Sequence, residues 1–192
     1  MTRTDTQTAI LDAAQELIQT RGANGISYQH ISDMVRIRKA SIHYHFPTKE
    51  KLVEAVLRRY RVQFLGVVDA IVASGVSAPA KLRRYADLFA ATLREGAGLK
   101  VCLCGMLGAE LATLGRPAVA QVQRFYRENA ERLARILRQG RASGTLHFVG
   151  DPRTAGMVVF SALEGAMLVS RADGGIRDFR RLRDQTLKLF GA

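Results

Sequence analysis

Three positive charges lie within four residues of the N-terminal quarter of this chain, at Arg36, Arg38 and Lys39. Clustered Lys and Arg side chains gain free energy by displacing counterions from phosphate groups. The chemistry that this run predicts is the attraction of a polyanion. The formal net charge of +12 favours the same kind of partner, although the charge is spread along the chain and does not locate the site.

Two histidines follow this run, at His43 and His45. At positions i and i+2 of a helix they point to different faces, and no cysteine or carboxylate completes a set of metal ligands around them. The sequence therefore predicts no metal site and no cofactor.

Two carboxylates stand in otherwise apolar stretches of the remaining chain, Glu110 within Met106–Leu111 and Glu164 within Val158–Val169. Burying either one unpaired would cost several kcal/mol. Two interpretations stay open. Each carboxylate either pairs with an arginine or caps a neighbouring helix, or it recognises a ligand.

Two thiols, Cys102 and Cys104, lie beside Lys100 near the start of an expected helix, an environment that favours the reactive thiolate. The alternative is that they are small buried apolar side chains, which face apart at this spacing and do not bridge. The sequence leaves thiol sensing of oxidants or electrophiles as an open hypothesis.

Large or soft side chains recur at helical spacing in the same part of the chain and suit the wall of an apolar cavity, although each one singly is more often plain core. They are Phe64, Tyr85, Phe89, Met106, Phe125, Tyr126, Met157, Phe160 and Met167. The expected ligand-binding set is Phe64, Phe89, Cys102, Met106, Glu110, Phe125, Tyr126, Phe160 and Glu164.

The elements that must position these residues are helices. Thr4–Gln7 fits a capping box, and apolar residues then recur along one face of a helix that ends near Gly22. Ser27 can cap a second, short helix. After a break near Arg36, a third helix spans Lys39–Phe46, and Pro47 stops it. Two short helices with a tight turn, braced by a longer one, form a helix-turn-helix whose second member can enter a major groove.

Beyond Thr48 the pattern is helical almost throughout, without strand-like alternation of useful length. The expected segments are about 49–74, 80–96, 101–114, 118–142, 153–172 and 177–190, separated by breaks that contain Gly or Pro. The fold class is therefore all-α, with about nine helices. We expect a three-helix DNA-binding headpiece at residues 1–48 and a helical bundle at residues 49–192 that binds a ligand and dimerises.

The composition is that of a globular protein, with 47% apolar and 24% charged residues. No run of 18 uncharged apolar residues occurs, the N-terminus is polar, and only two cysteines are present. We expect a cytoplasmic protein without a membrane partner.

The segment from Ile10 to Gly22, together with Ser27, Ile31 and Ile42–Leu52, resembles the headpiece of TetR-type repressors over about residues 5–56. The most specific part runs from the expected recognition helix through Phe46 to Lys49. This resemblance implies a sequence-specific DNA-binding transcriptional regulator, in the form of a ligand-responsive repressor. It also implies a homodimer on a palindromic double-stranded operator, a small-molecule effector of unknown identity, and no catalytic residues.

The resemblance also implies which residues contact DNA. Lys39, Ala40 and Ser41 lie near base edges, and Gln29 also reaches a base. Ser27, Tyr28, Tyr44 and Lys49 contact phosphates. The full expected set is Ser27, Tyr28, Gln29, Arg38, Lys39, Ala40, Ser41, His43, Tyr44 and Lys49. The chain departs from the family pattern at Arg36, where a turn glycine is usual, and at His43, where a tyrosine is usual.

The resemblance further implies a ligand pocket between the helices of the body and pairing of the last two long helices into a four-helix bundle. Small residues in those helices allow close backbone approach; they are Ala155, Gly156, Ser161, Ala162, Gly165 and Ala166.

Three other interpretations compete with this one. The high charge suits a non-specific architectural DNA-binding protein, and the arginine-rich stretch Arg124–Arg141 suits a helical module on a membrane surface or on a protein. An enzyme is disfavoured, because the sequence has no Gly-x-Ser-x-Gly elbow, phosphate loop or metal constellation.

Overall fold

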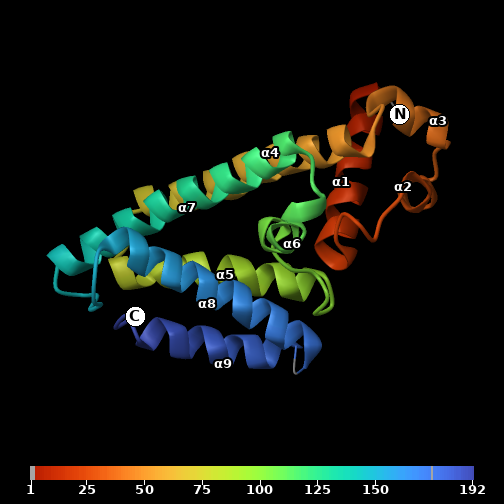
Figure 1. The fold of residues 1–192 in the computed structure, drawn as a ribbon. Helices are drawn as coiled ribbons and strands as arrows, with labels where there is room; N and C mark the ends of the chain where they lie inside the picture. Colours follow the sequence, from red (N-terminus) through yellow and green to blue (C-terminus); the bar gives the residue numbers. More distant parts are fainter. Residues whose placement is uncertain (1–2, 174) are drawn as a thin grey trace. The chain divides into compact units, whose positions relative to one another are not determined.

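A computed structural model of the chain describes residues 3–173 and 175–192, and the described residues are all-α (Figure 1). The helices are α1 (Arg3–Arg21), α2 (Tyr28–Val35), α3 (Lys39–His45), α4 (Lys49–Ala73), α5 (Ala78–Glu95), α6 (Leu103–Ala109), the short 3₁₀ helix η1 (Leu111–Thr113), α7 (Arg116–Ala142), α8 (Pro152–Ala172) and α9 (Gly175–Lys188). The described part of the chain contains no strand, which confirms the predicted fold class.

The helix ends lie close to the expected breaks, with three differences. The single helix expected at about 101–114 is wrong, because α6 ends at Ala109 and Glu110, with φ −104° and ψ 12°, leads into the separate 3₁₀ helix η1. α1 already includes Thr4, which the sequence predicted as its cap, and the two residues before Arg3 lie outside the described residues. The break expected at Gly174–Gly175 also falls partly on an undescribed residue, and α9 begins at Gly175.

The residue contacts divide the chain into two compact units, each made of two stretches of sequence. The first unit joins the residues up to Val62 with Leu103–Arg124, so it holds α1, α2, α3, α6, η1, the first half of α4 and the beginning of α7. The second unit joins Gln63–Cys102 with Phe125–Ala192. The helix-turn-helix therefore shares a core with residues that follow it by more than 40 positions in the sequence.

The core of the first unit is the apolar stripe that the sequence predicted for α1. Ile10, Ala14 and Ile18 are fully buried, and Ile31 of α2 and Ile42 of α3 are equally inaccessible. Burying a large aliphatic side chain contributes about 1.5–3 kcal/mol. This packing holds the two short helices, which are too short to be stable alone, in a fixed position.

The second unit is built around α8, which packs on α5 and α9. Asp151 caps α8, since its Oδ1 accepts hydrogen bonds from the backbone N–H groups of Arg153 at 3.0 Å and Thr154 at 2.9 Å. The buried Lys81 of α5 donates from Nζ to the carbonyl oxygen of Val72 at 2.7 Å and to Oε1 of Gln139 at 2.9 Å. The ammonium thereby satisfies a carbonyl in the last turn of α4 and ties α4 and α7 to α5.

By length and composition alone, α8 is the one helix among the described residues that could cross a bilayer, with a mean hydropathy of 1.3 over its most apolar window. That window is 44% buried, against α5 and α9. A core helix of a folded body passes the same test, so this feature is weak evidence for a membrane.

Candidate functional site

The turn between α2 and α3 is tight and hydrogen-bonded, although Arg36 stands at the position where a glycine is usual. Arg36 takes the left-handed conformation itself, with φ 60° and ψ 44°. Its backbone N–H and that of Ile37 both donate to the carbonyl oxygen of Ser32, and the Ser32 hydroxyl donates to the carbonyl oxygen of Ile37 at 2.6 Å. The tight turn is therefore kept, at the cost of placing a side chain in a region that favours glycine.

We expect Arg36→Gly to raise the free energy of unfolding by about 0.5–1 kcal/mol, because it relieves the left-handed strain. It should also weaken binding to every DNA sequence and make the salt dependence of binding shallower by about one unit if the guanidinium contacts a phosphate. Chemical denaturation and salt-dependent fluorescence anisotropy measure the two effects. The control Arg36→Lys keeps the charge and the Cβ, and it should change neither quantity appreciably.

α3 is amphipathic and presents one face to solvent. Ile42 is buried, and Phe46 directly after the helix is also buried. Lys39, Ala40, His43 and Tyr44 are exposed on the other side, with Tyr44 69% accessible. A short helix anchored by its apolar side, with its N-terminal residues free, has the form of a recognition helix.

The cations beside this helix are not neutralised. Among the described residues, Arg36, Arg38 and Lys39 are all exposed and none of them forms an ion pair. Their charges are therefore available to an external anion.

Tyr28 and Lys49, two of the expected phosphate contacts, also have internal partners. The Tyr28 hydroxyl donates to the carbonyl oxygen of Phe46 at 2.6 Å, and its ring lies edge-on to that of His43, with 4.7 Å between centroids. Burial, with a smaller contribution from the charge of Glu50, raises the pKa of Tyr28 to about 12. Since its single proton is already committed, Tyr28 has no proton left for a phosphate in this state.

Lys49 Nζ donates to the carbonyl oxygen of Ile26 at 2.8 Å. An ammonium group carries three protons, so two remain for a phosphate.

At the start of α2, Ser27 Oγ accepts a hydrogen bond from the backbone N–H of His30, and His30 Nδ1 accepts one from the backbone N–H of Ser27 at 3.1 Å. Gln29 is exposed, and its Nε2 donates to Oδ1 of Asp33 at 2.6 Å. All ten expected DNA-binding residues thus lie in the first unit, on α2, α3 or directly beside them.

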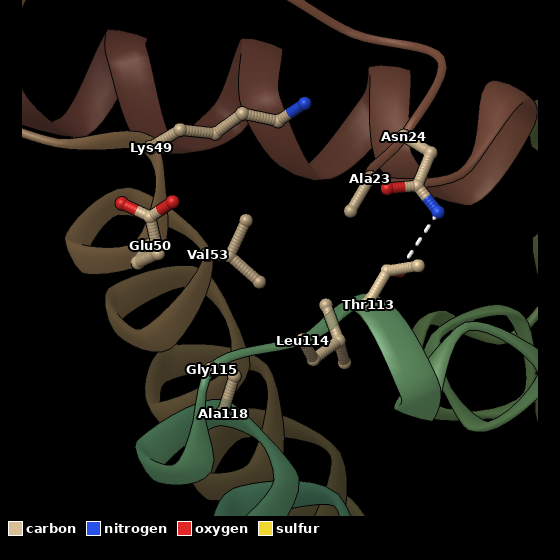
Figure 2. A pocket seen from close by; sticks show the side chains of 9 residues that line it. All are labelled: Ala23, Asn24, Lys49, Glu50, Val53, Thr113, Leu114, Gly115 and Ala118. Carbon is tan, nitrogen blue, oxygen red and sulfur yellow. Dashed lines mark hydrogen bonds between the residues drawn. The ribbon is translucent and has the colours of Figure 1, made fainter.

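Glu110 lies in the same unit and holds the turn that ends α1. Its Oε2 accepts from the backbone N–H of Ala23 at 2.7 Å and its Oε1 from that of Asn24 at 3.4 Å. The Asn24 side-chain amide donates to Oγ1 of Thr113 at 2.9 Å (Figure 2). We call this set of contacts the Glu110 clamp. The Glu110 clamp fits the interpretation that Glu110 caps a neighbouring helix. The sequence alone did not show that the capped groups are the backbone N–H groups of Ala23 and Asn24.

A small cavity of about 110 Å³ adjoins the Glu110 clamp, and Figure 2 shows the side chains around it. Val53, Leu114 and Ala118 supply apolar walls, while Glu50 and Asn24 supply polar groups. Met106, another expected ligand-binding residue, also belongs to the first unit, so neither it nor Glu110 shares a unit with the other seven.

Those other seven residues meet in the second unit. The rings of Phe64, Tyr85, Phe89, Phe125, Tyr126 and Phe160 form a connected aromatic cluster, with 5.4–6.3 Å between the centroids of contacting pairs. These rings come from α4, α5, α7 and α8. Edge-on and tilted contacts of this kind are favourable for aromatic pairs.

Glu164 lies one helical turn after Phe160 on α8. Glu164 as a whole is of intermediate burial, but its Oε1 is enclosed and has no hydrogen-bond partner. Burial raises the pKa of this carboxyl group to about 7, against a lowering effect of the hydrogen bond with the Cys102 side chain. Cys102 and Cys104 are both buried and unbridged.

Sequence reasoning missed one member of this site. The buried Asn129 exchanges hydrogen bonds with the Tyr85 hydroxyl, at 2.8 and 3.2 Å, inside the apolar face of α7. The sequence signal that could have identified Asn129 is its position as an amide within the apolar face of a long helix. Among the described residues, no group of three or more His, Cys, Asp and Glu side chains could hold a metal ion.

An amphipathic recognition helix behind a tight turn, with unpaired cations beside it, defines a helix-turn-helix DNA-binding protein. The comparisons then identify the family. The family described as "Bacterial regulatory proteins, tetR family" matches residues 10–56, and "Tetracyclin repressor-like, C-terminal domain" matches residues 78–186. The chain belongs to the TetR family of bacterial regulatory proteins.

Individual relatives agree with this assignment. The transcriptional regulator AcuR of Cereibacter sphaeroides is 24% identical over 166 residues, covering 86% of this chain and 76% of that protein. The transcriptional repressor NemR of Escherichia coli K12 is 23% identical over 177 residues, covering 88% and 86%. A TetR-family transcriptional regulator from Agrobacterium tumefaciens has a solved structure that is 29% identical, with a TM-score of 0.93 over the full length of both chains.

The predicted function is thereby confirmed at the level of the family. The chain is a DNA-binding, ligand-responsive transcriptional regulator of the repressor type, and it is not an enzyme.

Proposed function

We propose that this protein is a cytoplasmic homodimeric repressor whose headpiece, residues 1–48, reads a palindromic operator and whose body, residues 49–192, releases the DNA when a small effector binds. The observation that carries the DNA-binding half is the exposed face of α3, which starts with the unpaired Lys39 and is anchored from behind by the buried Ile42. Charge next to a fixed recognition helix supports binding to phosphates and base edges together.

In this proposal, Lys39, Ala40 and Ser41 face base edges, with Gln29 able to join them once its bond to Asp33 opens. Arg38, Tyr44 and Lys49 contact phosphates, as do the backbone and hydroxyl at Ser27. Tyr28 and His43 support the helix instead, because the Tyr28 proton is bound to Phe46 and its ring packs on His43.

The dimer in this proposal forms through α8 and α9, and the exposed face of α8 carries most of the apolar side chains that support it. Val158, Leu168 and Val169 of α8 are 54%, 49% and 62% exposed, and Leu182 of α9 is 40% exposed. A Cβ added at Gly165, between them, would meet no atom within 4 Å. An apolar stripe with small residues in it suits close, symmetric helix pairing, and it also accounts for the apolar character of α8.

The effector, in turn, is proposed to bind at the aromatic cluster with Glu164 in the second unit. That cluster combines apolar rings with a few buried polar groups, the usual composition of a small-molecule site. Shifting a regulator from 1:99 to 99:1 between two states requires about 5.5 kcal/mol of differential affinity from the effector.

Selection of bound duplexes from a random pool tests the proposal. We expect an inverted repeat whose half-sites lie about 34–36 Å apart, because a symmetric dimer presents its two recognition helices to successive major grooves. Equal affinity for selected and random duplexes at fixed salt would mean non-specific architectural binding instead.

Lys39→Ala should relax the preference at one operator position and cost about 1–3 kcal/mol of binding free energy on the selected site, because a base contact is lost. Its matched comparison is Lys49→Gln, which keeps a donor for Ile26. This second variant should weaken binding to all sequences alike and reduce the salt slope by about one. Fluorescence anisotropy over a salt series measures both. Uniform weakening by Lys39→Ala would make Lys39 a phosphate contact.

A further inference from the structure

We propose that the effector is a small organic cation, such as a quaternary ammonium compound, held by the Glu164 carboxylate within the aromatic cluster of the second unit. This inference rests on the proposed effector-binding function and names the chemical class of the ligand.

The first argument is an anion without a counterion. Glu164 forms no ion pair among the described residues, and its enclosed Oε1 has no hydrogen-bond partner. The side chains known to interact with it are the Cys102 thiol and the Tyr85 hydroxyl, neither of which is a cation, and that hydroxyl is bonded to Asn129. An ionised carboxylate in such surroundings lacks one positive partner, and a cationic ligand would supply it.

The second argument is the surface around the carboxylate. Phe160, four residues before Glu164 and hence on the same side of α8, contacts the rings of Phe89, Phe125 and Tyr126. Aromatic faces attract cations, most strongly where water is excluded. The same two features, the carboxylate and the ring faces, both repel an anionic ligand.

The third argument concerns how binding would be transmitted. The rings contact each other, so a ligand enters only as they separate. Phe64 is one of these rings, and it belongs to α4, the helix whose first residue is the proposed phosphate contact Lys49. Displacing Phe64 therefore acts on the helix that begins at the DNA-binding headpiece.

The main competitor is a neutral ligand that accepts a hydrogen bond from protonated Glu164. The two ligand classes differ in proton exchange. The pKa of Glu164 lies at about 7, so the carboxyl group is half ionised at pH 7. A cation selects the ionised form and releases protons upon binding, whereas a neutral acceptor selects the protonated form and takes protons up.

Isothermal titration calorimetry of the intact chain distinguishes these cases. The probes are tetramethylammonium and tetraethylammonium chloride, with 2-methylpropan-2-ol as the neutral control of similar shape. We expect the cations to bind and the alcohol not to bind. Affinity should rise about tenfold from pH 6 to pH 8, and about half a proton should be released at pH 7, measured in buffers of different ionisation enthalpy.

Two variants localise the effect. Glu164→Gln keeps the size and polarity of the side chain, and it should abolish both the pH dependence and the proton release while weakening cation binding at pH 8 at least tenfold. The control Glu131→Gln removes an exposed carboxylate of the same unit, whose partner is Arg153, and it should bind as the wild type does. If Glu164→Gln does not fold, the proton linkage of the wild type decides the question.

The proposal is overturned if neither cation binds at millimolar concentration, if the alcohol binds as tightly as the cations, if protons are taken up, or if Glu164→Gln binds the cations unchanged. Selection of an operator by the same protein preparation keeps this result separate from the proposed function. Intact operator selectivity without cation binding removes only the ligand class, whereas absence of selectivity removes the repressor itself.

Discussion

Gly22→Ala should lower the free energy of unfolding by about 2–4 kcal/mol, a large effect for the addition of one methyl group. Gly22 ends α1 with a φ of +78°, a conformation that costs an L-residue about 1–2 kcal/mol. Its added Cβ would also overlap with Oε1 of Glu110. The flexible carboxylate can move away, but it then leaves the backbone N–H groups of Ala23 and Asn24 without their charged partner.

Chemical denaturation of Gly22→Ala, Glu110→Ala and the double variant measures this effect. Glu110→Ala alone should cost about 1.5–3 kcal/mol, the usual contribution of hydrogen bonds to a charged group. The double variant should be less destabilised than the sum of the two, because the clash no longer exists once the carboxylate is absent. Strict additivity would show that the two residues act independently and would contradict the predicted clash between the added Cβ and the Glu110 carboxylate.

Glu164→Met should make the protein more stable at pH 8, with a gain that shrinks on acidification. The pKa of Glu164 is raised from 4.5 to about 7 in the folded chain. Below pH 4.5 the Glu164 carboxyl group is protonated in both the folded and the unfolded chain, so the raised pKa does not reduce the free energy of unfolding. Between pH 4.5 and 7 the unfolded chain releases the proton first, so the wild type loses stability as pH rises, by about 3 kcal/mol in total at about 1.4 kcal/mol per pKa unit.

The measurement is the difference in unfolding free energy between Glu164→Met and the wild type over that pH range. The difference should change in favour of the variant by about 3 kcal/mol from pH 4.5 to pH 8, whatever the packing of methionine adds as a constant. Glu131→Gln serves again as the exposed control, with a flat difference. A flat difference for Glu164→Met would mean that its carboxyl group titrates normally.

The sequence was sufficient to predict the parts of the fold that depend on local residue patterns. The apolar stripe of Ile10, Ala14 and Ile18 was expected, and all three are fully buried. The two short helices and the turn at Arg36 were expected as well, because spacing and capping residues set them. The left-handed backbone at Arg36 shows that the neighbouring contacts of Ser32 outweigh the intrinsic preference for glycine there.

The partners that no local pattern encodes are those far apart in sequence. Glu110 bonds to Ala23, 87 positions earlier, and Tyr85 bonds to Asn129, 44 positions later. Pairings of this kind depend on the packing of whole helices. The sequence therefore identified Glu110 and Glu164 as unusual carboxylates, and only the structure separates one that stabilises a turn from one that has no counterion.

The compact unit that contains the headpiece is not a continuous segment of the chain, and this affects how the headpiece can be studied. A fragment ending at residue 62 keeps every proposed DNA contact, yet it lacks Leu103–Arg124, which completes the same core. Such a fragment would expose the apolar surface that α6 covers on α1 and would lose the carboxylate that secures the turn at Gly22. Dissection by truncation would thus report on a weakened headpiece, and point substitutions in the intact chain are the sounder route.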